Sequence, residues 1–496
     1  MVYYSQILKG SKDMVFGLFK KRETADVILK GGNIYTLNPD APWAEAVACK
    51  DGRIMAVGEL KEIESLAGNN TEVIDLENGT LFPGFMDTCG HPVLQSFQNA
   101  CLILDEDMSQ EEVLAALAAY IEANPDNAAY FAYGFNASFV RNKPKEELQE
   151  VLDKICADKP ITLLDISGFD GWFNTNAIDL VKAAVAEEEE PPIVTLPYVL
   201  HVLSPIDFDQ VQASVLNLAA EYCQKGYTTV FDCGAPDYLH TIYQEIIIEM
   251  LQEEMLKQRF CGSALVTRNV SADYVFKKLL QKRTSCVETA EYINCNVLKL
   301  MIDDTTIAEE DNLKITPDAL KAFVAQAADQ GFDIHIDATG KSAVLSAFEA
   351  AALARAAGNR KSHVTIAHDH ALSAEEKMEL HIDNELCEIA PTLGDFNQKY
   401  RGIESAENVN DAIEKLTIDA ALQLGISDDF GSVEVGKYAD FVLFENNPLD
   451  CDLPTFRGLP AKMTVIGGEV VYNAKEDRPE DWNEILKERQ QEHIIE

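Results

Sequence analysis

The two ends of the chain share a pattern of short apolar runs interrupted by glycine turns. Near the N-terminus, Ala46–Lys50 and Arg53–Val57 lie on either side of Asp51-Gly52, a pair that favours a tight hairpin. Near the C-terminus, Met463–Ile466 and Glu469–Tyr472 flank Gly467-Gly468 in the same way. We therefore predict that residues 24–82 and 426–475 fold together as one small β-sandwich.

Between these regions, apolar runs alternate with stretches of helical periodicity. This alternation is typical of a parallel α/β barrel of the TIM type, which we place at residues 83–425, with an insertion at residues 95–215. The candidate strands are Leu81–Met86, Thr228–Asp232, Phe260–Val266, Val297–Ile302, Asp333–Ala338, Val364–His368 and Leu386–Thr392. These are seven runs, and no eighth occurs between residues 394 and 417. Either the barrel is incomplete or an irregular strand lies near Asp395–Tyr400.

The two termini differ from the rest of the chain. Residues 1–23 lack a signal-peptide pattern and are expected to form a disordered extension, although residues 14–22 would also suit a weak amphipathic helix at a membrane surface. Residues 476–496 are rich in charge and predict an exposed helical tail. No apolar run reaches the roughly 18 residues that suggest a membrane span.

Charge and cysteine content narrow the classes of partner and compartment. The chain carries 83 acidic and 41 basic residues, a formal net charge of −42, which argues against nucleic acids and anionic membranes as partners. Its 11 cysteines are scattered without C-x-x-C spacing, as expected for reduced thiols in the cytoplasm. A small-molecule substrate is the expected partner, and a homo-oligomer is compatible with the sequence.

Metal-binding residue types gather where the candidate strands end. Cys89 and His91 follow the first strand two residues apart, so both side chains can face one pocket, and both are good ligands for zinc. The later strands carry or end in further polar residues, namely Asp232, Cys233, Lys299, Asp303, Asp304, His335, Asp337, His368 and Asp369. Because barrel enzymes place function at the carboxyl ends of their strands, we predict a present or former metal site there.

Several of these segments resemble the amidohydrolase superfamily, in particular its amidohydrolase family 3 branch. The residues from Pro83 to His91 are similar to the signature P-G-F-x-D-x-H-x-H, with Cys89 in place of the first histidine. Residues 32–36, 51–58, 226–232 and 431–441 are also similar to elements of this family. The resemblance extends from Thr24 to about Asn473. It implies a barrel with a composite β-sandwich, a divalent metal and hydrolysis of carbon–nitrogen bonds other than peptide bonds.

The resemblance also implies a set of site residues. The metal ligands, for a zinc-like ion, would be Cys89, His91, Lys299, Asp337 and His368. Asp337 stands where the family has a histidine, and His335 lies one strand period earlier. Phe169 replaces a family histidine near the substrate, in a segment that also contains Trp172 and Asn174. The family's general base on strand eight has no counterpart, which leaves Asp303 and Asp395 as candidates.

These departures leave three hypotheses open. Two anionic ligands in place of neutral imidazoles would reduce the Lewis acidity of a bound metal, and loss of the base would cost on the order of 10²–10⁴ in rate. The chain is then a working metal-dependent hydrolase of N-acyl or formyl amides with altered ligands, a non-catalytic relative that binds a small molecule, or a shortened inactive family member.

Overall fold

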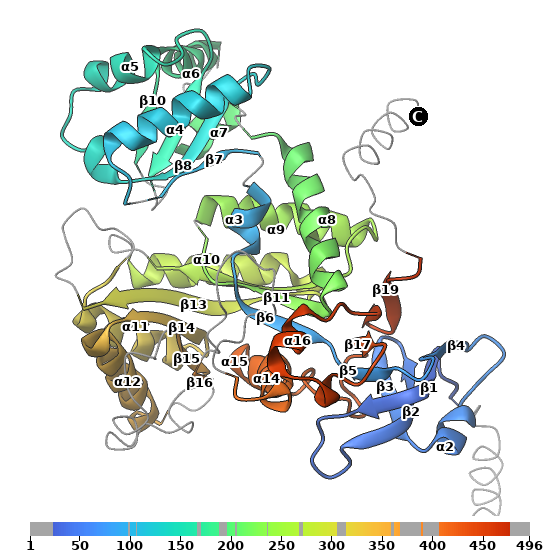
Figure 1. The fold of residues 1–496 in the computed structure, drawn as a ribbon. Coiled ribbons are helices and arrows are strands. Elements are labelled where there is room, and N and C mark those ends of the chain that lie inside the picture. The colour runs from blue at the N-terminus through green and yellow to red at the C-terminus, as the bar shows by residue number, and fades with distance from the viewer. Residues whose placement is uncertain are drawn as a thin grey trace, which may run out of the picture.

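The computed structural model describes residues 23–97, 100–105, 107–165, 170–187, 196–203, 206–235, 237–266, 271–304, 314–358, 362–367, 388–389 and 406–476. They form three β-sheets with associated helices (Figure 1). The predicted disordered extension lies outside these residues except for Glu23, and the predicted helical tail except for Glu476.

One mixed sheet is built from both ends of the chain, in the order β19-β18-β17-β5-β1-β2-β3 with β4 also paired to β1. Its strands are β1 Val27–Tyr35, β2 Trp43–Lys50, β3 Arg53–Gly58, β4 Glu72–Asp75, β5 Thr80–Pro83, β17 Phe441–Phe444, β18 Met463–Ile466 and β19 Glu469–Asn473, with α2 Leu60–Glu64 beside them. The antiparallel pairing of β5 with β17 joins the two ends. The structure shows a single sheet from both termini, so the predicted sandwich is not confirmed.

The predicted hairpin between β2 and β3 is confirmed, since the two strands pair antiparallel across Asp51 and Gly52. Both turn residues have positive φ, 48° and 74°, a conformation that Asp and Gly tolerate better than most residues.

A second sheet contains seven parallel strands in the order β16-β15-β14-β13-β12-β11-β6. They are β6 Phe85–Gly90, β11 Tyr227–Asp232, β12 Arg259–Leu265, β13 Ile293–Asp303, β14 Asp333–Thr339, β15 Val364–Ala367 and β16 Glu388–Ile389. The connecting helices are α8 Phe208–Gln224, α9 Asp237–Gln252, α10 Ala272–Ser285, α11 Pro317–Asp329 and α12 Lys341–Ala356, with the short η3 Val287–Thr289 after α10. The predicted alternation of parallel strands and helices is confirmed, but the sheet is a curled half-barrel and a full TIM barrel is not confirmed.

A helix lies between the two edge strands of the half-barrel. After α14 Val409–Leu416, α15 Ile418–Gln423 contacts both edge strands, β6 and β16. The Gln423 side chain donates to the Thr88 carbonyl of β6 at 3.1 Å, and the Gln423 carbonyl accepts from the Thr365 hydroxyl of β15 at 3.5 Å. In the described residues α15 therefore spans the gap between the edges, while Asp395–Tyr400, the alternative position for a strand, lies outside them.

The residues between α3 Pro92–Phe97 and α8 form a third unit, which Figure 1 shows on the far side of these two helices from the half-barrel. Its sheet has the order β10-β9-β8-β7. The elements are β7 Leu102–Ile103, α4 Gln110–Ala123, β8 Tyr130–Phe135, η2 Ala137–Phe139, α5 Lys145–Asp153, β9 Ile161–Asp165, β10 Gly171–Phe173, α6 Thr175–Glu187 and α7 Leu196–Leu203. It has a hydrophobic core of its own, and we call it the satellite unit.

Aromatic packing joins the terminal sheet to the half-barrel. The Phe85 ring at the start of β6 packs against Tyr227, Phe444 and Phe456, with ring centroids 6.3, 5.9 and 6.2 Å away. Phe456 belongs to α16 Leu453–Gly458, which follows η5 Pro448–Asp450. Gly226 must be a glycine here, because its φ is +85° and a side chain would collide with Val442.

Candidate functional site

Four neighbouring segments bring polar side chains together beyond the middle of the half-barrel strands. Lys299 of β13 is 1% exposed, and its Nζ donates to Asp337 Oδ2 of β14 at 2.8 Å. The same Nζ lies 3.6 Å from Cys233 Sγ, which follows β11, and Cys233 Sγ lies 3.5 Å from His335 Nε2. Cys233 also forms a hydrogen bond with Cys89 of β6. We call Cys89, Cys233, Lys299, His335 and Asp337 the strand-end cluster.

The charges in this cluster centre on Lys299. Burial alone would lower the pKa of its ammonium, but interactions with Cys233 and Asp337 outweigh burial and raise the pKa above its ordinary value. The hydrogen bond from Cys233 and the charge of Lys299 lower the pKa of the Cys89 thiol despite its burial. The cluster therefore holds a buried cation beside a carboxylate and two thiols.

His91 lies close to this cluster in an uncharged form. Burial, and then the charge of Lys299, lower the pKa of His91 to about 4. The Nδ1 atom lies 3.3 Å from the Gly234 carbonyl, so the neutral ring that carries its proton on Nδ1 donates there and leaves Nε2 as an acceptor.

The described side chains do not fit a metal centre. Among the residues that the structure describes, no three His, Cys, Asp or Glu side chains are arranged to hold an ion. Asp337, a predicted ligand, is paired with the Lys299 ammonium, which brings a positive charge to the place expected for a metal. The predicted ligand His368 lies outside the described residues.

The other predicted site residues lie apart from the cluster or outside the described part. Asp303 forms an ion pair with Lys314 at 2.8 Å. Trp172 and Asn174 belong to the satellite unit, where the Trp172 indole donates to the Leu148 carbonyl and Asn174 bonds to backbone groups around β9. Both side chains are buried and serve the packing of that unit. Phe169 and Asp395 lie outside the described residues.

Two buried carboxylates lie near the cluster. Asp87 accepts hydrogen bonds from the Tyr222 hydroxyl at 3.0 Å and from the Cys89 backbone N–H at 3.1 Å, and so helps to fix the backbone of β6 at Cys89. Asp232 is fully buried, with one oxygen 3.4 Å from the Val93 N–H, and its other oxygen has no hydrogen-bond partner among the described residues. Only the position of Asp232 at the end of an apolar run signalled its proximity to the site.

Asp232 should make stability depend on pH. Burial raises its pKa to about 7. The unfolded carboxyl loses its proton near pH 4, so between about pH 4 and pH 7 the folded protein holds a proton that the unfolded chain does not. The contribution of this group to stability is therefore present at low pH and is lost as pH rises to about 7. In urea unfolding at several pH values, Asp232→Asn should show a smaller loss of stability over this interval than the wild type, and parallel curves would contradict the assignment.

The sequence profile of the amidohydrolase family matches residues 72–381 and 389–472. The chain belongs to the amidohydrolase family. The curated relatives of this amidohydrolase include the exoenzymes regulatory protein AepA of Pectobacterium carotovorum subsp. carotovorum, 28% identical over 171 residues, which are 34% of this chain and 37% of the relative. They also include the N-substituted formamide deformylase of Arthrobacter pascens, 28% identical over 158 residues, which are 32% and 29% of the two chains. The matches thus span about a third of each relative's length.

Solved structures support the fold. A zinc-bound adenosine deaminase from Xanthomonas campestris superposes with a TM-score of 0.52 at 14% identity, over 95% of this chain and 98% of the other. An uncharacterized metal-dependent hydrolase from Pyrococcus furiosus gives a TM-score of 0.50 at 15% identity, over 86% of this chain and all of the other. At these identities the likeness extends to the fold alone. No helix in the described part of this amidohydrolase combines the length and apolar character needed to cross a bilayer.

Proposed function

We propose that this amidohydrolase cleaves a non-peptide carbon–nitrogen bond in a small molecule of the N-acyl or formyl amide class. Family membership supports a hydrolase, and the name of the Arthrobacter relative supports the amide class. The observation that carries the proposal is the strand-end cluster, because polar residues from separate strands meet where barrel enzymes bind substrate. The net charge of −42 supports a small molecule rather than a nucleic acid as the partner.

The cluster offers specific interactions to an amide. The Lys299 ammonium can donate to the amide carbonyl oxygen and would stabilise negative charge on that oxygen as the carbonyl is attacked. Asp337 can accept from the amide N–H. Zinc, the ion in the Xanthomonas deaminase structure, would require a ligand beyond the described residues, for which we propose His368.

A second candidate function is binding without turnover. The Lys299–Asp337 ion pair favours it, because this pair uses two of the predicted metal ligands within the protein. In that case the strand-end cluster would retain affinity for an amide or a carboxylate while lacking the activated water that hydrolysis needs.

An assay of amine release distinguishes the two functions. It uses a panel of N-formyl and N-acyl amines, with and without added zinc. The hydrolase proposal predicts release by the wild-type chain that exceeds release by Asp337→Asn, a variant of the same volume that removes the carboxylate. Amide-induced thermal stabilisation without amine release in either zinc condition would instead support binding alone. Release that is unchanged in Asp337→Asn would place the chemistry outside the strand-end cluster.

A further inference from the structure

Two cysteines outside the strand-end cluster meet around one glutamine. Cys286 caps the C-terminus of α10, and Cys295 lies near the start of β13. Gln244 of α9 donates from Nε2 to Cys286 Sγ at 2.8 Å, and Cys295 Sγ donates to Gln244 Oε1 at 3.8 Å. The two thiols are also close enough for each to shift the pKa of the other. Three separate elements therefore hold the two sulfur atoms side by side.

A cavity of 340 Å³ reaches this pair at the amino-terminal edge of β12 and β13. Its wall includes both cysteines together with Arg259, Cys261 and Tyr292. Cys286 and Cys295 are only 2% and 1% exposed, so bulk solvent has little direct access to them. A small molecule in the cavity can approach them.

The two thiols differ in acidity. The interaction with Cys295 lowers the pKa of Cys286 despite burial, with help from Ser285, Gln244 and the charge of Lys282. The same interaction, and then burial, raise the pKa of Cys295. Cys286 is thus the better nucleophile, and Cys295 stays a protonated thiol beside it.

We propose that Cys286 and Cys295 form a peroxide-sensitive dithiol, a modification site that small hydroperoxides reach through the cavity. The Cys286 sulfur attacks one oxygen of the hydroperoxide, the O–O bond breaks, and the products are a sulfenic acid on Cys286 and an alcohol, or water from hydrogen peroxide. The Cys295 sulfur then attacks the sulfenic sulfur, and its proton leaves with the hydroxyl group as water. The dithiol is oxidised to a disulfide by two electrons and the peroxide is reduced.

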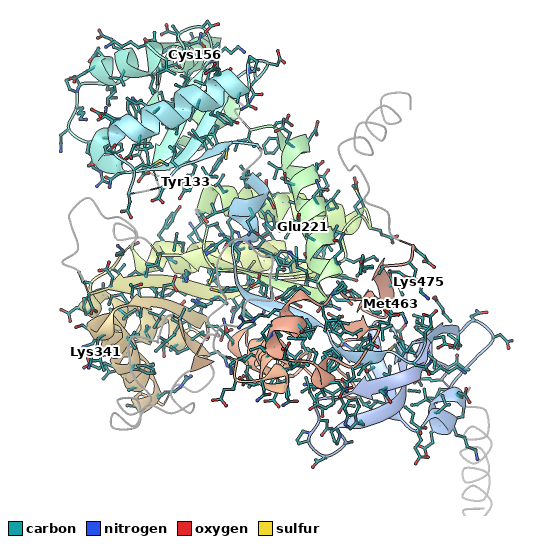
Figure 2. All side chains as sticks on the ribbon, in the orientation of Figure 1. Tyr133, Cys156, Glu221, Lys341, Met463 and Lys475 are labelled. Carbon is teal, nitrogen blue, oxygen red and sulfur yellow. The ribbon has the colours of Figure 1, made fainter. Side chains whose placement is uncertain are left out.

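Other cysteines provide internal controls. Among the described residues, Cys89, Cys156 and Cys451 are the more exposed thiols; Cys156 and Cys451 serve as controls, and Figure 2 marks Cys156 on the satellite unit. Burial is the largest of the causes that raise the pKa of the Cys156 and Cys451 thiols. Cys261 lines the same cavity as the pair, and burial raises its pKa to about 12. Exposure alone would direct oxidation to Cys156 and Cys451, and access to the cavity alone would include Cys261.

The test is oxidation of the full chain by limiting hydrogen peroxide, followed by alkylation and peptide mass spectrometry. We expect a disulfide between Cys286 and Cys295 before Cys156, Cys261 or Cys451 is modified, and its loss on reduction with dithiothreitol. In Cys295→Ala, which removes the second thiol, dimedone should label Cys286 as a persistent sulfenic acid. Cys261→Ala should form the disulfide as the wild type does.

Mapping in the wild type keeps the proposal testable even if a variant folds poorly. Free thiols at Cys286 and Cys295 in protein already oxidised at Cys156 or Cys451 would overturn it. A disulfide that includes Cys261, or dimedone on Cys261 rather than Cys286, would overturn it as well. None of these outcomes depends on amide hydrolysis, so the proposal stands or falls separately from the proposed function.

Discussion

Replacing Arg259 by alanine is expected to lower the free energy of unfolding by about 3–5 kcal/mol, the usual cost of removing one partner from a buried ion pair. The guanidinium forms two bonds to Asp440, from Nε to Oδ2 at 2.7 Å and from Nη2 to Oδ1 at 2.8 Å. The two side chains are 3% and 6% exposed. Arg259 begins β12 and Asp440 precedes β17, so the pair joins the half-barrel to the terminal sheet, and its loss leaves Asp440 buried without its cation.

Urea unfolding measures this effect, and the pair Lys30–Glu64 supplies the control. Its side chains are 34% and 47% exposed, so Lys30→Ala should change stability by less than about 1 kcal/mol. The double variant Arg259→Met/Asp440→Leu should be more stable than Arg259→Ala, because it leaves neither charge unpaired. A similar small loss for Arg259→Ala and Lys30→Ala would show that the buried pair contributes little.

Replacing Lys299 by methionine should reduce kcat/KM for amide hydrolysis by on the order of 10²–10³, the cost of losing one preorganised donor to a developing oxyanion. Methionine has a similar length and no charge. The variant also leaves Asp337 without its cation, so stability should fall as well.

A double variant separates these two effects. Lys299→Met/Asp337→Leu removes both charges, so it should recover stability relative to Lys299→Met while hydrolysis stays low. Lys314→Met is the matched control, because Lys314 also pairs with an aspartate, Asp303 at 2.8 Å, but is 34% exposed and lies outside the strand-end cluster. Recovery of hydrolysis in the double variant would assign Lys299 a structural role only.

The sequence located most strands of the half-barrel because buried parallel strands read as continuous apolar runs. It was less successful where one run serves two sheets. The predicted strand Leu81–Met86 contains the end of β5 and the start of β6, which separate at Pro83-Gly84 and enter different sheets. Hydrophobicity does not show this separation, since residues 81–86 are all buried.

The position of α15 between the two edge strands could not be predicted for a related reason. Helical periodicity predicts one helix over residues 409–422, but the structure ends α14 at Leu416 and begins α15 at Ile418. Thr417 between them has φ −130° and ψ −84°, and its hydroxyl bonds back to the Ile413 carbonyl. The pattern shows that these residues are helical, whereas only tertiary contacts show that the second helix lies between β6 and β16.

The strand-end cluster was predicted in part. Strand order brings Lys299 and Asp337 to adjacent strands, and the structure pairs them. The position of Cys233 between Lys299 and His335 depends on how the chain leaves β11, which no spacing in the sequence determines. Trp172 and Asn174 follow from the family motif, but a motif does not show that a segment packs within its own core.

In the described residues, the two edges of the curled sheet are joined through α15 and not through paired strands. Neighbouring strands elsewhere are held by a ladder of backbone bonds, whereas the described link from Thr88 to Thr365 runs through the single residue Gln423. Fluctuations that widen the half-barrel therefore concentrate along this line. The described part of the half-barrel thus has a preferred direction of opening.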